Sequence, residues 1–357
     1  MIETQGQVQT NSVMDMDARE GSYLGGVSLG FELAARLISA PNHHAMTCTL
    51  LTIVEQFPGI IDASCYEVFS KASDTESSSK SSVNSDDELL FRRFPLTLDD
   101  NYKDENTNIL GSLLLENNNP VRQIRYQDKS IILLRVDEVI PRRVVFIEGA
   151  LSDHYFAILK GLYSVYARQT QLLDTKERDS LTHLLNRQSL DQTLAQVRSY
   201  YRANPEKNAQ GLASWLAVLD IDNFKAVNDT YGHIFGDEVL IHFSNILQEQ
   251  MRFSDFLFRF GGEEFIVILN QVNRDGAKVA FERLRRSVEQ YNFPSGQVTV
   301  SIGCGFIDCG KASEVILEEA DKAVYAAKSA GRNRVVFFDE MVQSVPSASA
   351  TGDVELF

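Results

Sequence analysis

The feature that most constrains the fold of this chain is a Gly-Gly pair set between two apolar runs. The segment Arg259-Phe-Gly-Gly-Glu-Glu-Phe265 connects Phe256–Phe258 with Ile266–Leu269. Aromatic and β-branched runs separated by two glycines predict a β-hairpin, with positive φ at one or both glycines. Glu263 and Glu264 are then carried at the tip, where glycine has no Cβ to keep a metal ion or a phosphate away. An ordinary hairpin with a solvated acidic tip has the same pattern.

The charge of the chain excludes some classes of partner. Asp and Glu number 49 against 34 Lys and Arg, for a formal net charge of −15. Duplex nucleic acid and anionic membrane surfaces repel a protein of this charge, so we expect neither as a partner. A substrate that carries phosphate needs local positive charge or metal ions.

Length, hydropathy and cysteine usage limit where the protein works. A chain of 357 residues has room for two domains of ordinary size. No window approaches the roughly 20 apolar residues of a membrane-spanning helix, and the N-terminus has no basic-then-apolar signal pattern. The four cysteines fall at no metal-ligand spacing, which is typical of reduced thiols. We therefore expect a cytoplasmic protein with no membrane span.

The first part of the chain predicts a disordered polar arm over residues 1–21 and a small α+β domain over 22–150. Apolar residues recur at helical spacing over Val27–Ile38 and again over Met46–Phe57, before Pro58-Gly59. Strand-like runs follow, interrupted by a Ser- and Asp-rich stretch that we expect to be a long exposed loop. The loop is Ser70–Asp87, and the expected strands are Ala63–Phe69, Ile109–Leu115, Ile131–Val136 and Arg143–Ile147.

Helices, then antiparallel strands, then a closing helix are typical of a small sensor module. In this order of elements, and in the register of the Ala34–Ala40 helix, the first domain resembles a GAF domain, a ligand-binding module found ahead of many signalling enzymes. A PAS-like module is the alternative. The resemblance implies an unknown small-molecule ligand. His43-His44, Cys48 and Cys65 also suggest haem or metal ligation, but an adjacent histidine pair before a helix is more often solvated.

One long helix is expected over residues 151–178, because apolar residues recur there in two stripes at spacings of three, four and seven. Two stripes on a helix between domains predict a short parallel coiled coil, and hence a homodimer through this linker helix and the sensor domain. Gln169 occupies the missing position of the first stripe. A helix packed onto the first domain is the alternative. The stripes are Ile158, Leu162, Val165 and Leu172, and Tyr155, Leu159, Tyr166 and Leu173.

The second domain is expected over residues 179–340, with a disordered tail over 341–357. The order of its elements, βααββαβ with an extra helix and a final strand, predicts an α+β sandwich whose helices cover one face of an antiparallel-containing sheet. Around the central hairpin, the expected elements are a helix Gln188–Tyr201, a loop Pro205–Gly211, a strand Trp215–Asp220, a helix from Gly236 to Met251, a helix Arg274–Tyr291, a strand Val298–Gly305, a helix Lys311–Ser329 and a strand Val335–Phe338.

A divalent-metal site can be built from the buried strand and the hairpin. Asp220 ends the strand, so its carboxylate is presented where the chain leaves the core, facing Glu263 at the tip. Both supply the hard oxygen ligands that Mg²⁺ prefers, with Glu264 close by and the carbonyl of Ile221 able to contribute. Lys225 offers a mobile positive charge for a phosphoryl oxygen.

Asn228 and Asp237 carry the donors and acceptors that read a purine edge, since an Asp can accept two N–H groups of guanine. Together with the hairpin, these residues belong to an ordered set of motifs that resembles the GGDEF family of diguanylate cyclases. The resemblance covers about Arg178 to Asp339. Its motifs are Asp179-x-Leu-Thr with Asn186-Arg187, Asp220-Ile-Asp-x-Phe-Lys225, Asn228-Asp229, Gly232-His233, Gly236-Asp237, Arg259–Phe265, Val300-Ser-Ile-Gly303, Ala320-Asp-Lys-Ala, Tyr325-x-Ala-Lys328 and Gly331-Arg332-Asn333.

The resemblance implies that two facing cyclase domains condense two GTP molecules to cyclic di-GMP, each domain holding one GTP and two Mg²⁺ or Mn²⁺ ions. It implies metal binding by Asp220, the Ile221 carbonyl, Glu263 and Glu264, with either Glu263 or metal assistance removing the 3′-hydroxyl proton. Glu263, Glu264 and Lys225 are the expected catalytic residues. The substrate-binding residues that it implies are Asn228 and Asp237 for guanine, Lys328 and Arg332 for the triphosphate, and Gly261 and Gly262 against the nucleotide.

Arg252-x-x-Asp255, just before the hairpin, matches the family's inhibitory site for the product, and Arg283 matches a further contributor. A surface Arg–Asp pair of little energetic consequence is the alternative. Two positions depart from the family pattern: His183 stands where Gly is usual, and Leu185 where Pro is common. They put in doubt only how rigidly this segment transmits a signal. A non-catalytic cyclic di-GMP receptor is the alternative function.

Overall fold

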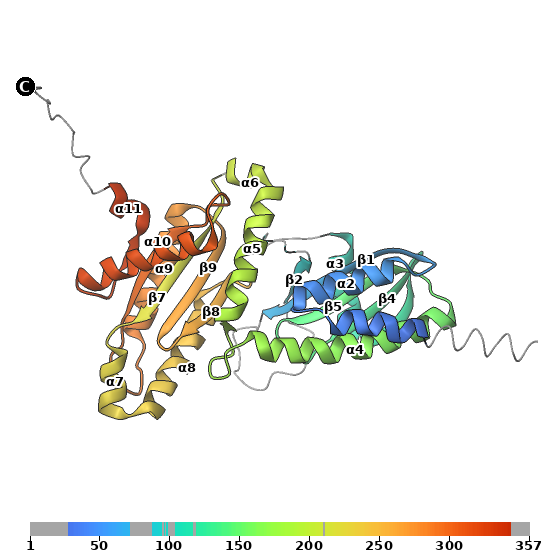
Figure 1. Cartoon of the computed structure of the whole chain (residues 1–357), viewed down its shortest axis with the longest axis horizontal. Helices are drawn as coiled ribbons and strands as arrows, with labels where there is room; N and C mark the ends of the chain where they lie inside the picture. The colour runs from blue at the N-terminus through green and yellow to red at the C-terminus, as the bar shows by residue number, and fades with distance from the viewer. Residues whose placement is uncertain are drawn as a thin grey trace, which may run out of the picture. The chain divides into compact units, whose positions relative to one another are not determined.

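The computed structural model describes residues 28–71, 88–94, 96, 98, 104–116, 119–209 and 211–343. By their contacts the described residues form two compact units, which meet in the chain at Lys176 and Glu177 (Figure 1). The arm expected over 1–21 and residues 72–87 of the expected loop lie outside the described residues. In the part of the chain that the structure describes, no helix is both long and apolar enough to cross a bilayer.

The first unit is built on a five-stranded antiparallel sheet in the order β2-β1-β5-β4-β3. One face of this sheet packs against a helix over 28–38, α2 and α4, and the other face packs against α3 (Figure 1). The elements are the helix over 28–38, α2 His43–Glu55, β1 Ile60–Lys71, β2 Glu88–Phe94, α3 Glu105–Glu116, β3 Val121–Tyr126, β4 Lys129–Val136, β5 Arg142–Gly149 and α4 Asp153–Glu177.

Three of the four strands expected in this unit are confirmed, as β1, β4 and β5, and both expected helices are present. The strand expected over Ile109–Leu115 is wrong, because these residues lie in α3. Asp104 and Thr107 cap its first turn: the Thr107 N–H donates to Asp104 Oδ1 at 2.8 Å, and the Asp104 N–H donates to Thr107 Oγ1 at 3.2 Å. The residues it buries against the sheet, at helical spacing, are Leu110, Leu113 and Leu114.

The long helix expected over 151–178 is confirmed as α4. Most of the second stripe faces the sheet of the first unit, with Leu159, Tyr166 and Leu173 buried. Leu162 of the first stripe is buried with them, whereas Leu172 is 52% exposed. The helix therefore packs onto the first unit and still leaves part of the first stripe at the surface.

The second unit contains a six-stranded sheet in the order β11-β10-β7-β9-β8-β6. The expected βααββαβ core is confirmed as β7-α7-α8-β8-β9-α9-β10. The elements are β6 Leu185–Asn186, α5 Arg187–Ala203, α6 Pro205–Ala209, β7 Ala213–Ile221, α7 Phe224–Tyr231, α8 His233–Gln250, β8 Phe256–Gly261, β9 Glu264–Val272, α9 Arg274–Gln290, β10 Val300–Phe306, α10 Ser313–Ser329, β11 Val335–Phe337 and α11 Phe338–Gln343.

Helices cover both faces of this sheet, so the expectation that they cover one face is wrong. Helices α8 and α9 bury Phe243 and Phe281 in a core that includes Leu219 and Phe265. Helix α10 packs on the opposite face, where a Cβ added to Gly303 would lie 2.2 Å from the backbone nitrogen of Val324 (Figure 1). Strand β7 is accordingly buried along nearly its whole length, as both-face coverage requires.

Some boundaries differ from the expectations by a few residues. Helix α8 begins at His233 rather than at Gly236, and the short helix α6 lies in the expected loop Pro205–Gly211. Helix α11 takes in residues 341–343 of the expected tail, and residues 344–357 lie outside the described residues. None of these shifts moves a candidate site residue off the element that carries it.

Candidate active site

The tip of the hairpin has the backbone conformation that its glycines predict. Gly262 lies at φ +48°, a left-handed conformation that glycine adopts without steric cost. Both Gly261 and Gly262 are exposed. Arg259 holds the tip from the side, donating to the Gly262 carbonyl oxygen from Nε at 3.3 Å and from Nη2 at 3.0 Å. Its Nη1 donates to Asp179 Oδ1 at 3.0 Å, so one guanidinium ties the tip to the start of the second unit.

Strand pairing brings the acid at the end of β7 to the acids of the tip. Asp220 lies directly opposite Glu264 in the antiparallel pair of β7 and β9. The next residue, Ile221, donates its N–H to the Glu263 carbonyl oxygen at 3.4 Å. Asp220 is only 6% exposed, whereas both glutamates are half-buried. The strand register therefore places Asp220 beside the hairpin tip, with Glu264 rather than Glu263 directly opposite it.

The electrostatics of this group favour a bound cation. Burial raises the pKa of Asp220, although Lys328 opposes this with its Nζ 2.7 Å from Asp220 Oδ2. Burial and then the charge of Asp220 raise the pKa of Glu263. Burial, Asp220 and Asp321 raise the pKa of Glu264. Clustered carboxylates that disfavour one another's ionised forms are stabilised when positive charge enters among them.

The donor set fits a hard divalent cation. Asp220, Glu263 and Glu264 offer carboxylate oxygens and Ile221 a carbonyl, the ligand types that Mg²⁺ and Mn²⁺ take. Across the described ranges, no three or more His, Cys, Asp or Glu side chains already converge closely enough to hold a metal ion. The ammonium group of Lys328 instead supplies the positive charge beside Asp220.

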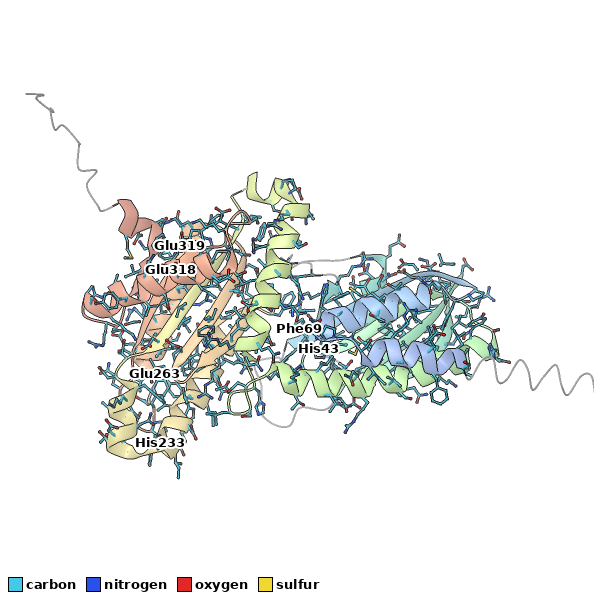
Figure 2. All side chains as sticks on the ribbon, viewed as in Figure 1. His43, Phe69, His233, Glu263, Glu318 and Glu319 are labelled. Atoms are coloured by element: carbon cyan, nitrogen blue, oxygen red, sulfur yellow. The ribbon has the colours of Figure 1, made fainter. Side chains whose placement is uncertain are left out.

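A second cluster lies at the corner between α7 and α8. Gly232, at φ +88°, forms the turn between the two helices. Asn228 lies in α7 just before this turn, and Asp237 lies in α8 just after it. Gly236 makes room between the helices, because a Cβ added to it would lie 2.0 Å from Asn228 Oδ1. Figure 2 shows His233 at this corner and Glu263 at the hairpin tip of the same unit.

The candidate cations lie on two different elements. Lys225 is exposed on the first turn of α7, and its side chain makes no hydrogen bond or ion pair within the described residues. Lys328 lies in the last turn of α10, against Asp220. Arg332 is exposed in the turn that follows α10, and its charge lowers the pKa of Asp220. The structure thus brings Lys328 and Arg332 to the carboxylates more closely than the sequence alone indicated.

The residues expected at the inhibitory site share one end of the hairpin. The Asp255 carboxylate accepts the N–H groups of Arg252 and Asn270, each at 3.0 Å, and so shapes the turn that leads into β8. Arg283 of α9 donates to the Gln250 carbonyl oxygen at 2.6 Å, two residues before Arg252. Strand β8 runs from this turn to the tip, about 20 Å for its six residues at the usual rise per residue.

Several residues that take part in the site had no expected role. Asp179 and Arg259 belong to quoted motifs, but only the fold shows that they join. The charge of Asp321 raises the pKa of Glu264, and the charge of Arg187 lowers it. The Arg187 guanidinium also lies over the Phe260 ring, 4.5 Å from its centroid. The departure at His183 also has a structural reading: its φ is +59°, a conformation that glycine favours.

The histidine and cysteine candidates of the first unit do not form a metal group. His43 is 5% exposed, so the expectation of a solvated histidine is wrong for this residue. Its Nε2 forms a hydrogen bond with the Thr170 carbonyl oxygen of α4 at 2.9 Å. Cys65 is buried in β1, and burial raises the pKa of its thiol to about 12. His43 therefore joins two helices of the first unit.

Comparison with known proteins places the second unit in a family. Residues 176–334 match the family described as diguanylate cyclase, GGDEF domain. Diguanylate cyclase DgcZ of Escherichia coli strain K12 is 34% identical over 207 residues, which cover 55% of this chain and 67% of that protein. Diguanylate cyclase A of Treponema denticola is 37% identical over 192 residues, 52% of this chain and 51% of that protein. Diguanylate cyclase DgcP of Pseudomonas aeruginosa is 38% identical over 161 residues, 44% of this chain and 23% of that protein.

Solved structures with similar sequences also cover this region. The coiled coil and GGDEF domain of DgcB from Caulobacter crescentus, in complex with c-di-GMP, is 30% identical with a TM-score of 0.45, covering 50% of this chain and 94% of that one. The active GGEEF domain of a diguanylate cyclase from Vibrio cholerae is 30% identical with a TM-score of 0.39, covering 43% and 97%. The chain spans about a quarter of DgcP and half of the Treponema protein.

Proposed function

Because this chain belongs to the GGDEF family of diguanylate cyclases, we propose that it condenses two GTP molecules to cyclic di-GMP and two pyrophosphates. One observation carries the proposal: β7 and β9 pair so that Asp220 lies opposite Glu264 and beside the Glu263 backbone. Acids on segments more than 40 residues apart meet at a glycine turn, where a nucleotide can approach without meeting a Cβ at Gly261 or Gly262.

Asp220, the Ile221 carbonyl, Glu263 and Glu264 would hold the Mg²⁺ or Mn²⁺ ions, two per active site. When bound, these ions polarise the α-phosphate and the attacking oxygen and neutralise developing charge. The chain's own residues keep the carboxylates in place: Arg259 fixes the tip, and the β7–β9 ladder fixes Asp220 against it. Lys328 shields Asp220 and would turn to the triphosphate when substrate and metal enter.

Substrate binding divides between two ends of the site. Asn228 and Asp237 would read the guanine edge at the α7–α8 corner, where the amide of Asn228 lies against Gly236. Lys328 and Arg332 would bind the triphosphate, joined by Lys225 as a mobile phosphate-stabilising charge. Such a division would hold the α-phosphate between the guanine-binding corner and the charged turn after α10, and would orient it for in-line attack.

Removal of the 3′-hydroxyl proton has two candidate routes. Glu263 of the hairpin tip is one candidate, since its carboxylate can accept the proton as a general base. A metal ion held by these carboxylates would provide the other route by lowering the pKa of the hydroxyl.

Regulation would act through dimer geometry and product binding. Each domain holds one GTP, so condensation needs two domains face to face, in a homodimer formed through α4 and a GAF-like N-terminal domain with an unknown small-molecule ligand. Leu172, which is exposed on α4, would contact a second copy in such a dimer. Cyclic di-GMP would bind at Arg252, Asp255 and Arg283, which share one end of the hairpin.

A non-catalytic cyclic di-GMP receptor is the alternative function. Incubation of the full chain with GTP and Mg²⁺ separates the two: pyrophosphate release with cyclic di-GMP supports the cyclase, and nucleotide binding without turnover supports the receptor. The sequence retains all the residues expected for turnover, which favours the cyclase: Asp220, Lys225, Asn228, Asp237, Glu263 and Glu264.

A further inference from the structure

Asp222 is a buried acid in a quoted motif to which the proposed function gives no role. It is 5% exposed and follows the end of β7 by one residue. Its carboxylate accepts three hydrogen bonds, from Ser301 Oγ at 2.6 Å, from Thr299 Oγ1 at 2.7 Å and from the Asn333 backbone N–H at 3.0 Å. A buried carboxylate that is hydrogen-bonded to two other segments fixes them relative to one another. Displacing any partner would leave a carboxylate oxygen in the interior without its hydrogen bond.

The turn that Asp222 holds has an unusual backbone. Gly331, Arg332 and Asn333 lie at φ +113°, +63° and +47°, so two non-glycine residues in succession adopt the left-handed conformation. This conformation is sterically unfavourable for residues with a Cβ, and it persists only where surrounding contacts impose it.

The side chain of Asn333 supplies further contacts that impose the turn. Its Oδ1 accepts from Arg285 Nη1 at 2.7 Å, and its Nδ2 donates to Glu289 Oε1 at 2.6 Å. Both partners lie on α9, and Asp222 holds the backbone of Asn333 from the opposite side. Asn333 is therefore fixed by three groups, and Arg332 beside it has little freedom in its backbone.

Two acids at the end of one strand thus hold both ends of a short cationic segment. Asp220 pairs with Lys328 at 2.7 Å, and Asp222 holds Asn333, so Arg332 lies between two anchored residues. The Arg332 N–H also donates to the Ala327 carbonyl oxygen at 3.0 Å, which closes the segment onto the end of α10. The guanidinium itself is exposed.

We propose that Asp222 and Asn333 are positioning residues that hold Arg332 in place for the triphosphate of the substrate. This inference rests on the proposed function, because it assigns Arg332 to phosphate. Neither residue touches substrate. They keep the left-handed turn formed before the substrate binds. GTP binding then does not have to order this segment, so no affinity is lost to that ordering.

The test compares two nucleotides on the full chain. One is 3′-deoxy-GTP with Mg²⁺, which carries the triphosphate and lacks the attacking hydroxyl; the other is GMP, which lacks the β- and γ-phosphates. Asn333→Gly keeps access to positive φ but removes the two side-chain contacts. We expect the Kd of this variant for 3′-deoxy-GTP, measured by calorimetry, to rise about 10-fold, and its Kd for GMP, measured by competition, to stay unchanged. Asp222→Ala should behave alike.

Two comparisons separate positioning from general damage. Asn273→Ala removes the side chain that caps α9, away from this turn, so it should lower the melting temperature and leave both affinities unchanged. In an Arg332→Ala background, Asn333→Gly should have no further effect on 3′-deoxy-GTP, because the group that it positions is gone.

Each result decides one question. Wild-type protein that fails to bind 3′-deoxy-GTP overturns the proposed function itself. Wild-type binding with an unchanged Asn333→Gly variant overturns only the positioning role. Equal weakening toward GMP and 3′-deoxy-GTP, or additive effects with Arg332→Ala, also overturns it.

Discussion

Replacing Gly236 by alanine separates the stability of α8 from the recognition of guanine. A Cβ at this position would lie 2.0 Å from Asn228 Oδ1 and 3.0 Å from its Cγ, so the amide must move by about 1.4 Å to reach ordinary van der Waals contact at 3.4 Å. A misplacement of about 1 Å in a substrate-positioning group can cost about 100-fold in rate. We therefore expect kcat/KM for GTP to fall 10- to 100-fold, mainly through KM.

The fold should be far less affected than the activity. Glycine within a helix is roughly 0.5–1 kcal/mol less favourable than alanine, and this gain opposes the cost of displacing one half-buried amide, about 0.5–1.5 kcal/mol. The free energy of unfolding should thus stay within about 1 kcal/mol of the wild-type value. Gly111→Ala is a matched control, since Gly111 lies in α3 and a Cβ there would have nothing within 4 Å.

The assay is steady-state production of cyclic di-GMP across a range of GTP concentrations, beside urea unfolding of the same samples. An Asn228→Ala variant shows whether the loss passes through the amide, because adding Gly236→Ala to it should then change little. A Gly236→Ala protein whose KM stays within two-fold of the wild-type value would refute the reasoning.

Four further predictions follow from the site and the first unit. Glu264→Gln or Asp220→Ala should abolish product formation in a GTP assay while circular dichroism stays native, and near-normal turnover in either contradicts the metal assignment. Without divalent metal, Glu264→Gln should raise the melting temperature at pH 7. The gain in the free energy of unfolding should be no more than about 1 kcal/mol. The pKa of Glu264 is raised in the folded protein, so ionising this carboxyl group as pH rises destabilises the wild type. The greater stability of Glu264→Gln should therefore vanish toward pH 4, where the carboxyl group is protonated. A stability difference that does not depend on pH would contradict this prediction. Arg252→Ala should shift the inhibition curve for added cyclic di-GMP to higher concentration, and an unchanged curve removes Arg252 from the inhibitory site. Asp104→Ala, which uncaps α3 and removes the 2.7 Å hydrogen bond from Tyr66 Oη, should lower the unfolding free energy of the first unit by about 1–2 kcal/mol; unaltered melting would discount this cap.

Local patterns in the chain were sufficient for most of the fold. The hairpin, the long helix α4 and the βααββαβ order of the second unit follow from hydrophobic period and glycine placement. The strand expected over Ile109–Leu115 fails because a short apolar cluster suits either a strand or a helix. The cap formed by Asp104 and Thr107 distinguishes the two, and it depends on two side chains rather than on periodicity.

The order of acids and glycines in the sequence also indicated where the candidate site lies. Asp220 and the tip acids were expected to meet, and the strand register brings them together. The partners of those acids were not foreseen. Lys328 lies 108 positions along the chain from Asp220, and Asn333 lies 111 positions from Asp222, so no local spacing relates them.

Sequence by itself determined which chemistry this protein carries, because carboxylates, amides and glycines in a fixed order limit what the hairpin and its neighbouring strand can bind. Only the tertiary structure decided how those groups are supported. It places helices on both faces of the second sheet, sets Lys328 on Asp220, and holds a left-handed turn between Asp222 and α9. The physical reason is that pairing across a sheet and packing of α10 join residues far apart in the chain, and the energies of those contacts depend on burial, which no local pattern specifies.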